Sequence, residues 1–525
     1  MKITPKTLVR SSRIFLGSVL LLAPFFLSCI KEKEEDRPNI IYIMVDDMGY
    51  SDLGCYGGEI ETPNLDKIAA GGIKMRSFYN NARCCPTRAS LLTGRYPHEV
   101  GMGHMVSTVG KKYEEGSYQG FLHQNIPTIA ELLREAGYRT YMSGKWHVGE
   151  RPEHWPRKRG FDRYFGLING ASSFYEVIPQ EKGKRQFVLD DEEYQTPPDF
   201  YATDAFTDFA LQYLDDHRTH QQGAPFFLYL AYTAPHFPLH APESDVEKYL
   251  DLYKEGWDVI RERRFQRMKR LGVIDERFTY FPRPEDIPAW EEVDNKEEWV
   301  RKMAVYAAMI DRMDQNIGRL VEKLKANGQW DNTLIVFISD NGACAENVAK
   351  RNFHDPQAKI GARGSYVTYD TPWANVSNTP FKKYKRYLHE GGVISPCIIS
   401  WPAKIKPQSN YHSVPGYIVD LVPTALELAG RNADIPLAGK SLSPLWTGEP
   451  IEERIYCWEH EGNQAIRVGD WKLVKDKQDP TWALYNIDKD PSEAVDLSSS
   501  ESDRTATMQK MYEEWVAKVG AKPYR

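Results

Sequence analysis

The chain has 525 residues, of which 41% are hydrophobic and 27% are charged, an ordinary composition for a globular protein. Its formal net charge of −6 gives no basic surface for nucleic acid, so we exclude that class of partner. Seven cysteines are few for a disulfide scaffold of this size. The scattered ones are interpreted as buried small residues, although some of them could pair.

The first 28 residues are typical of an export signal. Basic side chains precede a short apolar run at residues 14–27, which is too short for a membrane span. Ser28 and Cys29 then resemble a bacterial lipobox with Cys29 as the lipidated residue, and the alternative is a plain secreted protein. We therefore predict a protein of the periplasm or cell surface whose contact with the membrane is a lipid anchor.

After Arg37, predicted strands and helices alternate. The continuous apolar run at residues 39–45 is typical of a strand buried on both faces of a parallel sheet, and further candidates for buried strands occur at residues 138–143, 225–233 and 333–339. Capping residues and amphipathic spacing predict helices at residues 62–72, 126–138 and 302–328. This alternation predicts an α/β fold with a large, mixed, mostly parallel sheet flanked by helices.

Two other regions have a different character. Residues 253–299 are charged and rich in tryptophan, which predicts an insertion with short helices over the sheet edge. Short alternating strands and a helix at 505–520 predict a smaller antiparallel subdomain at the C-terminal end. We expect a catalytic domain at residues 37–435 and this subdomain at residues 450–525.

Polar residues follow each of the four predicted strands. Because ligands bind outside the carboxyl ends of strands in open α/β sheets, these side chains could meet at one edge. Any single one of them could instead cap a helix or a turn, but the coincidence at four strands favours a shared site. The candidates are Asp46, Asp47, Lys145, His147, His236, Asp340 and Asn341.

Residues 81–95 contain two adjacent cysteines, Cys84 and Cys85. Neighbouring cysteines rarely bridge each other, because disulfide geometry needs more widely separated Cα atoms. Cys84 begins a C-x-P-x-R pattern that ends at Arg88, and four residues of helix would bring both side chains to the same face. The alternative is a pair of buried thiols at the start of a helix.

Together these segments resemble a type I sulfatase of the alkaline-phosphatase superfamily, in its arylsulfatase-like branch. The resemblance covers nearly all of the chain after Arg37 and depends on motifs that occur in the family's order. One departure is Ser395, because an arginine is common in the family before the proline that follows E-G-G. The motifs lie at residues 39–57, 84–101, 144–149, 233–242, 337–342, 378–392 and 484–497.

The resemblance implies that a maturation enzyme oxidises Cys84 to formylglycine, while Cys85 stays a thiol. The hydrated aldehyde would attack the sulfur of an O-sulfate ester and later expel inorganic sulfate. The resemblance also implies a bound Ca²⁺ rather than Mg²⁺, a cation that prefers oxygen ligands. The implied metal ligands are Asp46, Asp47, Cys84, Asp340 and Asn341.

The resemblance assigns further roles around the sulfate group. Lys385 is chosen over Lys382 and Lys383 because the family's lysine lies five residues before the glutamate of E-G-G, here Glu390. The remaining implied roles are sulfate binding by Lys145 and Lys385, support of the aldehyde hydrate by Arg88, proton transfer by His147 and protonation of the departing alcohol by His236.

Three other histidines are candidates for substrate binding. His460 lies in a polar and aromatic stretch, where it could touch a sugar or could be a hydrogen-bonded surface histidine. His104 and His240 are weaker candidates for the same role.

We therefore expect an exported sulfatase that acts on a sulfated carbohydrate, such as a terminal sugar sulfate. One alternative is a phosphonate or phosphate ester hydrolase of the same superfamily, which a comparison of sulfate and phosphate esters would separate. Another is an inactive glycan-binding surface lipoprotein, and the presence of the nucleophile, metal, lysine and histidine candidates argues against it.

Overall fold

The structure is a computed structural model and describes residues 37–106, 116–178, 185–221, 223–348, 353–432 and 434–522. The predicted signal peptide and Cys29 lie outside the described residues. Within the described part of the chain, no helix is long and apolar enough to cross a membrane.

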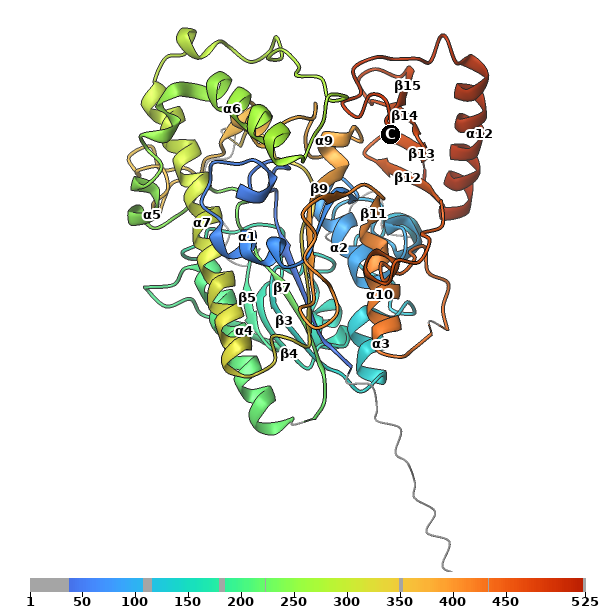
Figure 1. The fold of residues 1–525 in the computed structure, drawn as a ribbon. Helices are drawn as coiled ribbons and strands as arrows, with labels where there is room; N and C mark the ends of the chain where they lie inside the picture. Colours follow the sequence, from blue (N-terminus) through green and yellow to red (C-terminus); the bar gives the residue numbers. More distant parts are fainter. Residues whose placement is uncertain are drawn as a thin grey trace, which may run out of the picture. The chain divides into compact units, whose positions relative to one another are not determined.

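Two sheets organise the described residues (Figure 1). The larger sheet has eleven strands in the order β10-β2-β9-β8-β1-β7-β3-β4-β5-β6, and β11 also pairs with β2. Its strands are β1 (Asn39–Val45), β2 (Ile73–Tyr79), β3 (Arg139–Gly144), β4 (Arg163–Leu167), β5 (Phe187–Leu189), β6 (Glu192–Tyr194), β7 (Phe226–Ala231), β8 (Thr333–Ser339), β9 (Ile394–Ser400), β10 (Tyr411–His412) and β11 (Gly416–Tyr417).

The centre of the larger sheet is parallel. Neighbouring strands run in the same direction across β8-β1-β7-β3-β4, whereas β9 is antiparallel to both β8 and β2. The predicted strands at 39–45 and 333–339 are confirmed to the residue as β1 and β8, and β3 and β7 confirm the other two within a residue or two. Apolar runs located these strands well because almost every residue in them is buried.

Helices cover both faces of this sheet (Figure 1). On one face α7 contacts α1, α4 and α5, and on the other α2, α3 and α10 contact one another. The helices that precede the C-terminal sheet are α1 (Pro63–Ala70), α2 (Cys84–Thr93), α3 (Ile129–Glu135), α4 (Ala202–His220), α5 (Glu243–Glu247), α6 (Gly256–Leu271), α7 (Lys296–Ala326), α8 (Asp370–Ser377), α9 (Glu390–Val393), α10 (Leu421–Leu428) and α11 (Pro444–Thr447).

Two sequence predictions in this region need correction. Helix α7 begins at Lys296, six residues before the predicted start, because Asn295 turns the chain with a φ of 54° and acidic residues occupy the first turn. The charged insertion contains one helix of 16 residues, α6, rather than short helices alone. Helix α6 packs against α8, and two of its arginines are buried, so its charge did not signal exposure.

The C-terminal residues form the second sheet. Its four antiparallel strands are packed against helix α12 (Ser502–Val519) around a small apolar core. The strands are β12 (Ile455–His460), β13 (Asn463–Val468), β14 (Trp471–Lys475) and β15 (Trp482–Asn486). The predicted fold class, an α/β sheet with a smaller antiparallel subdomain, is therefore confirmed.

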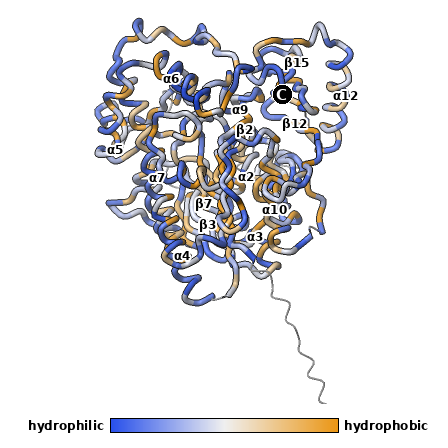
Figure 2. Tube along the Cα trace, viewed as in Figure 1, coloured by the Kyte–Doolittle hydropathy of each residue, from blue (hydrophilic) through white to orange (hydrophobic). Residues whose placement is uncertain are grey.

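The main hydrophobic core surrounds the central strands, where hydrophobic segments gather beside α2 and α10 (Figure 2). The six cysteines among the described residues are all unpaired, and Cys55 alone of these is not fully buried. The prediction that the scattered cysteines are small buried residues is confirmed for all of those described except Cys55, which is partly exposed.

Candidate active site

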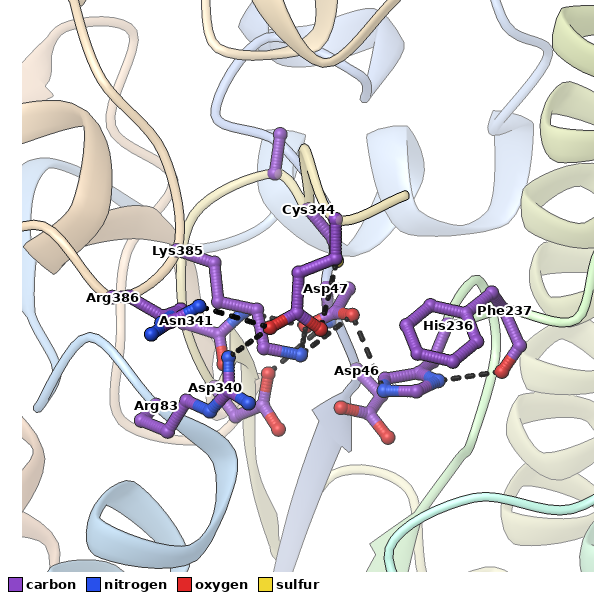
Figure 3. Close-up of polar contacts among 12 residues, drawn as sticks. Asp46, Asp47, Arg83, His236, Phe237, Asp340, Asn341, Cys344, Lys385 and Arg386 are labelled. Carbon is purple, nitrogen blue, oxygen red and sulfur yellow. Dashed lines mark hydrogen bonds and ion pairs between the residues drawn. The ribbon is translucent and has the colours of Figure 1, made fainter. Parts of the chain in front are cut away.

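Polar side chains follow the carboxyl ends of four neighbouring strands, β8, β1, β7 and β3, at one edge of the sheet. Figure 3 shows that those after β8, β1 and β7 lie close together. The parallel register makes this convergence possible, because all four chain segments leave the sheet on the same side. All seven predicted side chains are buried: Asp46, Asp47, Lys145, His147, His236, Asp340 and Asn341.

The backbone after β1 is bent sharply. Asp47 has a φ of 67°, in the left-handed region that non-glycine residues seldom adopt. Its amide donates a hydrogen bond of 3.2 Å to Oδ1 of Asp340. This bond joins the ends of β1 and β8, so the acidic residues of the two strands lie side by side. Strained backbone of this kind often accompanies a functional site.

Helix α2 brings the cysteine motif to the same edge. Cys84 is its first residue, and every residue of the helix is buried. One turn later, Nη2 of Arg88 donates to Oδ2 of Asp340 at 3.0 Å and lies 3.7 Å from Oδ2 of Asp46. The four-residue spacing therefore turns both ends of the motif toward the strand ends.

Cations and carboxylates alternate within the site. Nζ of Lys145 is 2.5 Å from Oδ2 of Asp46, and Nζ of Lys385 is 2.7 Å from Oδ1 of Asp47. Nε2 of His236 lies 3.4 Å from Oδ2 of Asp47. Lys385, which comes from the loop before α9, is therefore brought to the residues that follow the strands.

The acidic residues have oxygen atoms to offer a cation. Asp46, Asp47 and His236 each have a ligand atom within 4.8 Å of the others. Oδ1 of Asp46 and Oδ1 of Asn341 are buried and have no hydrogen-bond partner among the described residues. Buried acceptors are normally satisfied, and oxygen donors of this kind fit a hard divalent ion.

The buried charges shift the acid–base behaviour of the site. Burial alone would raise the pKa of Asp46, but the charges of Lys145, His236 and Arg88 outweigh it and hold this pKa below its ordinary value. Burial and the neighbouring Asp46 raise the pKa of Asp340. The two carboxyls therefore differ in their affinity for a proton, which is expected where like charges share a site.

The groups around Cys84 favour a thiolate and a neutral imidazole. A hydrogen bond from Cys85 lowers the pKa of Cys84 against the effect of burial, and Lys145 adds to the lowering. Burial lowers the pKa of His147 to about 4. Nε2 of His147 lies 3.2 Å from Sγ of Cys85, and the ligand atoms of Cys84, Cys85 and His147 lie within 4.8 Å of one another. A neutral His147 could accept a proton at this position.

The three weaker histidine candidates lie in two places. The rings of His104 and His460 are 5.7 Å apart, and each has Nε2 at 3.8 Å from Oε1 of Glu461. His460 is 1% exposed and its ring nitrogens have no hydrogen-bond partner among the described residues, so the surface alternative is wrong.

His240 is held differently. Its Nε2 is 2.7 Å from the carbonyl oxygen of Ser365, and its Nδ1 accepts a hydrogen bond of 3.3 Å from the amide of Phe174. Both ring nitrogens of His240 are therefore engaged by protein groups, and neither nitrogen is left for a substrate.

Several charged residues near the site were missed by sequence reasoning. Nη1 of Arg83 is 2.7 Å from Oε1 of Glu346, and Nε of Arg386 donates to Oε2 of Glu461 at 2.8 Å. Figure 3 shows Arg83 and Arg386 beside Lys385. Their positions in the sequence could have indicated them, because Arg83 directly precedes Cys84 and Arg386 directly follows Lys385.

The departure at Ser395 has a local explanation. Its hydroxyl accepts a hydrogen bond of 2.8 Å from Nδ2 of Asn80 and donates one of 2.7 Å to the carbonyl oxygen of Ser339. Ser395 thus joins β8 and β9 to the segment before α2, and it leaves the candidate catalytic residues unchanged.

Comparison with known proteins identifies the family. The Sulfatase family model matches residues 38–431, which is most of the chain. The chain belongs to the sulfatase family. A second model, described as N-sulphoglucosamine sulphohydrolase, C-terminal, matches residues 381–520 of this sulfatase.

Similar proteins cover nearly the same length. An uncharacterized sulfatase of Schizosaccharomyces pombe is 33% identical over 93% of this chain and 94% of its own length. The arylsulfatase of Klebsiella aerogenes is 36% identical over 78% and 91%, and the N-acetylgalactosamine-6-sulfatase of Rattus norvegicus is 31% identical over 83% and 71%. The crystal structure of Ps i-CgsB in complex with k-i-k-neocarrahexaose has a TM-score of 0.69 and 30% identity over 93% and 95%. The protein is therefore a sulfuric ester hydrolase.

Proposed function

We propose that this sulfatase removes O-sulfate groups from a carbohydrate, in particular from a terminal sugar, with Cys84 converted to formylglycine. The observation that carries the proposal is the convergence of Cys84 and Arg88 with the acidic residues and lysines that follow the strands. The similarity to a rat N-acetylgalactosamine-6-sulfatase and to a structure that holds a neocarrahexaose supports a sugar substrate. The export signal and lipid anchor proposed for residues 1–29 would place this activity on extracellular glycans.

The proposed cation is Ca²⁺, held by Asp46, Asp47, Asp340, Asn341 and the modified Cys84. The unpartnered oxygens of Asp46 and Asn341 support this assignment, since a cation would satisfy them. Ca²⁺ is chosen over Mg²⁺ from the family resemblance. When bound, such an ion withdraws charge from a sulfate oxygen and lowers the pKa of a coordinated hydroxyl.

The proposed nucleophile is the hydrate of the formylglycine at position 84. A maturation enzyme would supply the oxidation, and the C-x-P-x-R spacing selects Cys84 over Cys85. A hydrogen bond from Cys85 and the charges of Lys145 and Lys385 lower the pKa of the Cys84 thiol. The same two ammonium groups would favour ionisation of an attacking hydroxyl at this position. Arg88, fully buried and paired with Asp340, provides a fixed positive charge beside it.

Two lysines are proposed to bind the sulfate oxygens. Lys145 and Lys385 are buried and lie on the two adjacent carboxylates, Asp46 and Asp47. Buried cations held in place before reaction stabilise negative charge that develops in the transition state without further reorganisation.

Two histidines are proposed to transfer protons. Nδ1 of His236 is 2.6 Å from the carbonyl oxygen of Phe237, and because a carbonyl only accepts, this nitrogen carries the hydrogen. The opposite nitrogen, Nε2, lies 3.4 Å from Oδ2 of Asp47 and is the atom proposed to hold the proton that the departing alcohol needs. Burial lowers the pKa of His236, and the charge of Asp47 opposes this effect. His147, whose pKa is low because it is buried, is assigned the proton of the aldehyde hydrate.

Peptide mass spectrometry across residues 81–95 tests this proposal. In active protein from the native host we expect loss of the Cys84 sulfur and an aldehyde that a hydrazide traps. Cys84→Ala should lose turnover, whereas Cys85→Ala, at the variable position of the motif, should keep the aldehyde at position 84. An intact Cys84 thiol in active protein would contradict the proposed nucleophile.

Paired substrates test the alternative chemistries. The sulfate and phosphate esters of one aryl alcohol present the same leaving group, so the ratio of their kcat/KM values reports the preferred ester. Membership of the sulfatase family favours the sulfate. A preference for phosphate or phosphonate would support the rival hydrolase, and glycan binding without turnover by matured protein would support the inactive lipoprotein.

A further inference from the structure

A buried lysine of the C-terminal sheet lies between two glutamates. Lys472, on β14, is 0% exposed, and its Nζ is 2.5 Å from Oε1 of Glu390 and 3.1 Å from Oε1 of Glu493. Both glutamates are also buried. Because an unpaired charge is costly in such surroundings, the three side chains depend on one another.

The two glutamates lie in motif segments, but the proposed reaction gives neither of them a role. Glu390 begins α9 and is the glutamate of E-G-G, while Glu493 lies in the motif at residues 484–497. Oε2 of Glu493 accepts a hydrogen bond of 2.9 Å from the amide of Glu390, at the start of α9. The hydroxyl of Tyr79 lies 3.0 Å from Oε2 of Glu390. Glu390 is therefore held by both the C-terminal sheet and the main sheet.

The two glycines after Glu390 touch the loop that carries Lys385. A Cβ atom at Gly391 would lie 2.4 Å from the carbonyl oxygen of Lys382, and one at Gly392 would lie 1.9 Å from that of Tyr387. Backbone contacts this close exclude any side chain. The loop from Lys382 to Tyr387 is thus packed directly on the segment that Lys472 and Glu493 hold.

The same glycines also touch the segment that carries Asn341. The amide of Gly342 donates to the carbonyl oxygen of Gly392 at 3.2 Å, and a Cβ at Gly342 would lie 1.9 Å from the carbonyl oxygen of Gly391. The amide of Lys385 donates to the carbonyl oxygen of Ala343 at 3.0 Å. A shift of E-G-G would therefore displace both a proposed metal ligand and a proposed sulfate-binding lysine.

We infer that the C-terminal subdomain positions the sulfate-binding residues, with Lys472 and Glu493 acting as positioning residues through Glu390. The inference rests on the proposed role of Lys385 in sulfate binding. The inference gives the four-stranded sheet a role in the reaction. Lys472 would act at a distance, because its ion-pair partners are Glu390 and Glu493 rather than a proposed catalytic side chain.

The test uses the full chain with matured Cys84 and a small aryl sulfate. Lys472→Met removes the charge and keeps most of the side-chain length. We expect kcat/KM to fall by about 10-fold to 100-fold, with the loss in kcat rather than in KM alone, because small misplacements of catalytic groups carry costs of this size. Lys475→Met is the matched control, since Lys475 lies on the same strand with its ammonium 5.6 Å from the Trp482 ring. This control should stay within about twofold of the parent.

A double-mutant cycle separates positioning from a general structural role. If Lys472 acts through Lys385, Lys472→Met should cost much less in a Lys385→Met background than in the parent. Equal losses in both backgrounds would overturn the inference, and so would a Lys472→Met variant that melts earlier but keeps parental kcat/KM per folded molecule. If Lys472→Met does not fold, Glu493→Gln provides the same test, because it keeps the shape of the side chain.

Failure of the proposed function has a different signature. In that case the matured parent would not hydrolyse the aryl sulfate, whatever residue stands at position 472. The positioning inference fails separately: the matured parent is active, and either the variants keep parental kcat/KM or the loss is the same with and without Lys385.

Discussion

Arg264 offers a quantitative test of how the acidic segment after β1 is held. It is 1% exposed, and its guanidinium donates to Oδ1 of Asp52 at 2.6 Å and to both oxygens of Glu59 at 2.7 Å. Oδ2 of Asp52 in turn accepts a hydrogen bond of 2.8 Å from the amide of Gly49, two residues after Asp47. Arg264→Met would remove the charge and leave the buried Asp52 and the partly buried Glu59 without their cation.

The expected cost follows from the burial of this cluster. Removing one partner of a buried ion pair costs about 3–5 kcal/mol, because the remaining charge is left uncompensated. The hydroxyl of Tyr306 at 2.7 Å from Asp52 and that of Tyr253 at 2.8 Å from Glu59 would remain. They satisfy part of the lost hydrogen bonding, so we expect the lower end of the range, about 3 kcal/mol of unfolding free energy.

The neighbouring Arg263 is the matched control. Its ion pair with Glu255 has a distance of 2.8 Å, but the two side chains are 46% and 50% exposed. A solvent-exposed pair contributes at most about 1 kcal/mol, so Arg263→Met should be nearly neutral. The two substitutions make the same chemical change one residue apart, and they differ in burial and in the number of carboxylates that lose a partner.

Urea denaturation of the parent and both variants measures the difference. Equal m-values would show that the midpoints report stability rather than a change in the unfolded chain. Adding Asp52→Asn to Arg264→Met should recover part of the loss, because one uncompensated charge is removed. The reasoning is refuted if Arg264→Met loses less than about 1 kcal/mol, or if Arg263→Met loses as much.

Two further predictions concern ions and protons. Removing divalent cations with a chelator should abolish turnover and lower the melting temperature, because Asp46, Asp47 and Asp340 would lose a compensating charge. Adding Ca²⁺ should restore both turnover and melting temperature. A melting temperature that does not change with Ca²⁺ would count against the metal site. Burial raises the pKa of Glu461, but nearby cations outweigh it and lower the pKa from 4.5 to about 2. The folded protein then binds fewer protons than the unfolded chain, so this stabilisation is present above about pH 4.5 and is lost as the pH falls toward about 2. Glu461→Gln should flatten that loss of unfolding free energy, and identical pH profiles would contradict the assignment.

The sequence by itself determined the central strands and the chemical types at their ends. Strands such as β1 and β8 are apolar at every position that the sheet buries, so their extent is visible in a local window of residues. The positions of Asp46 and Asp340 follow from these strand ends, and the place of Cys84 follows from the spacing of its motif. These features are local, and the direction of parallel strands is enough to bring them to one edge.

Only the tertiary structure decided which charges are paired and which histidines are available. Arg386 and Glu461 are 75 residues apart, and Lys472 and Glu390 are 82 apart, so no local pattern links them. The buried position of Arg264 could not be predicted either, because a charged helix is ordinarily interpreted as exposed. The local pattern of apolar residues indicates which side of a helix or strand faces the core. The partner of a buried charge instead depends on how the whole chain folds, because the two residues can be far apart in the sequence.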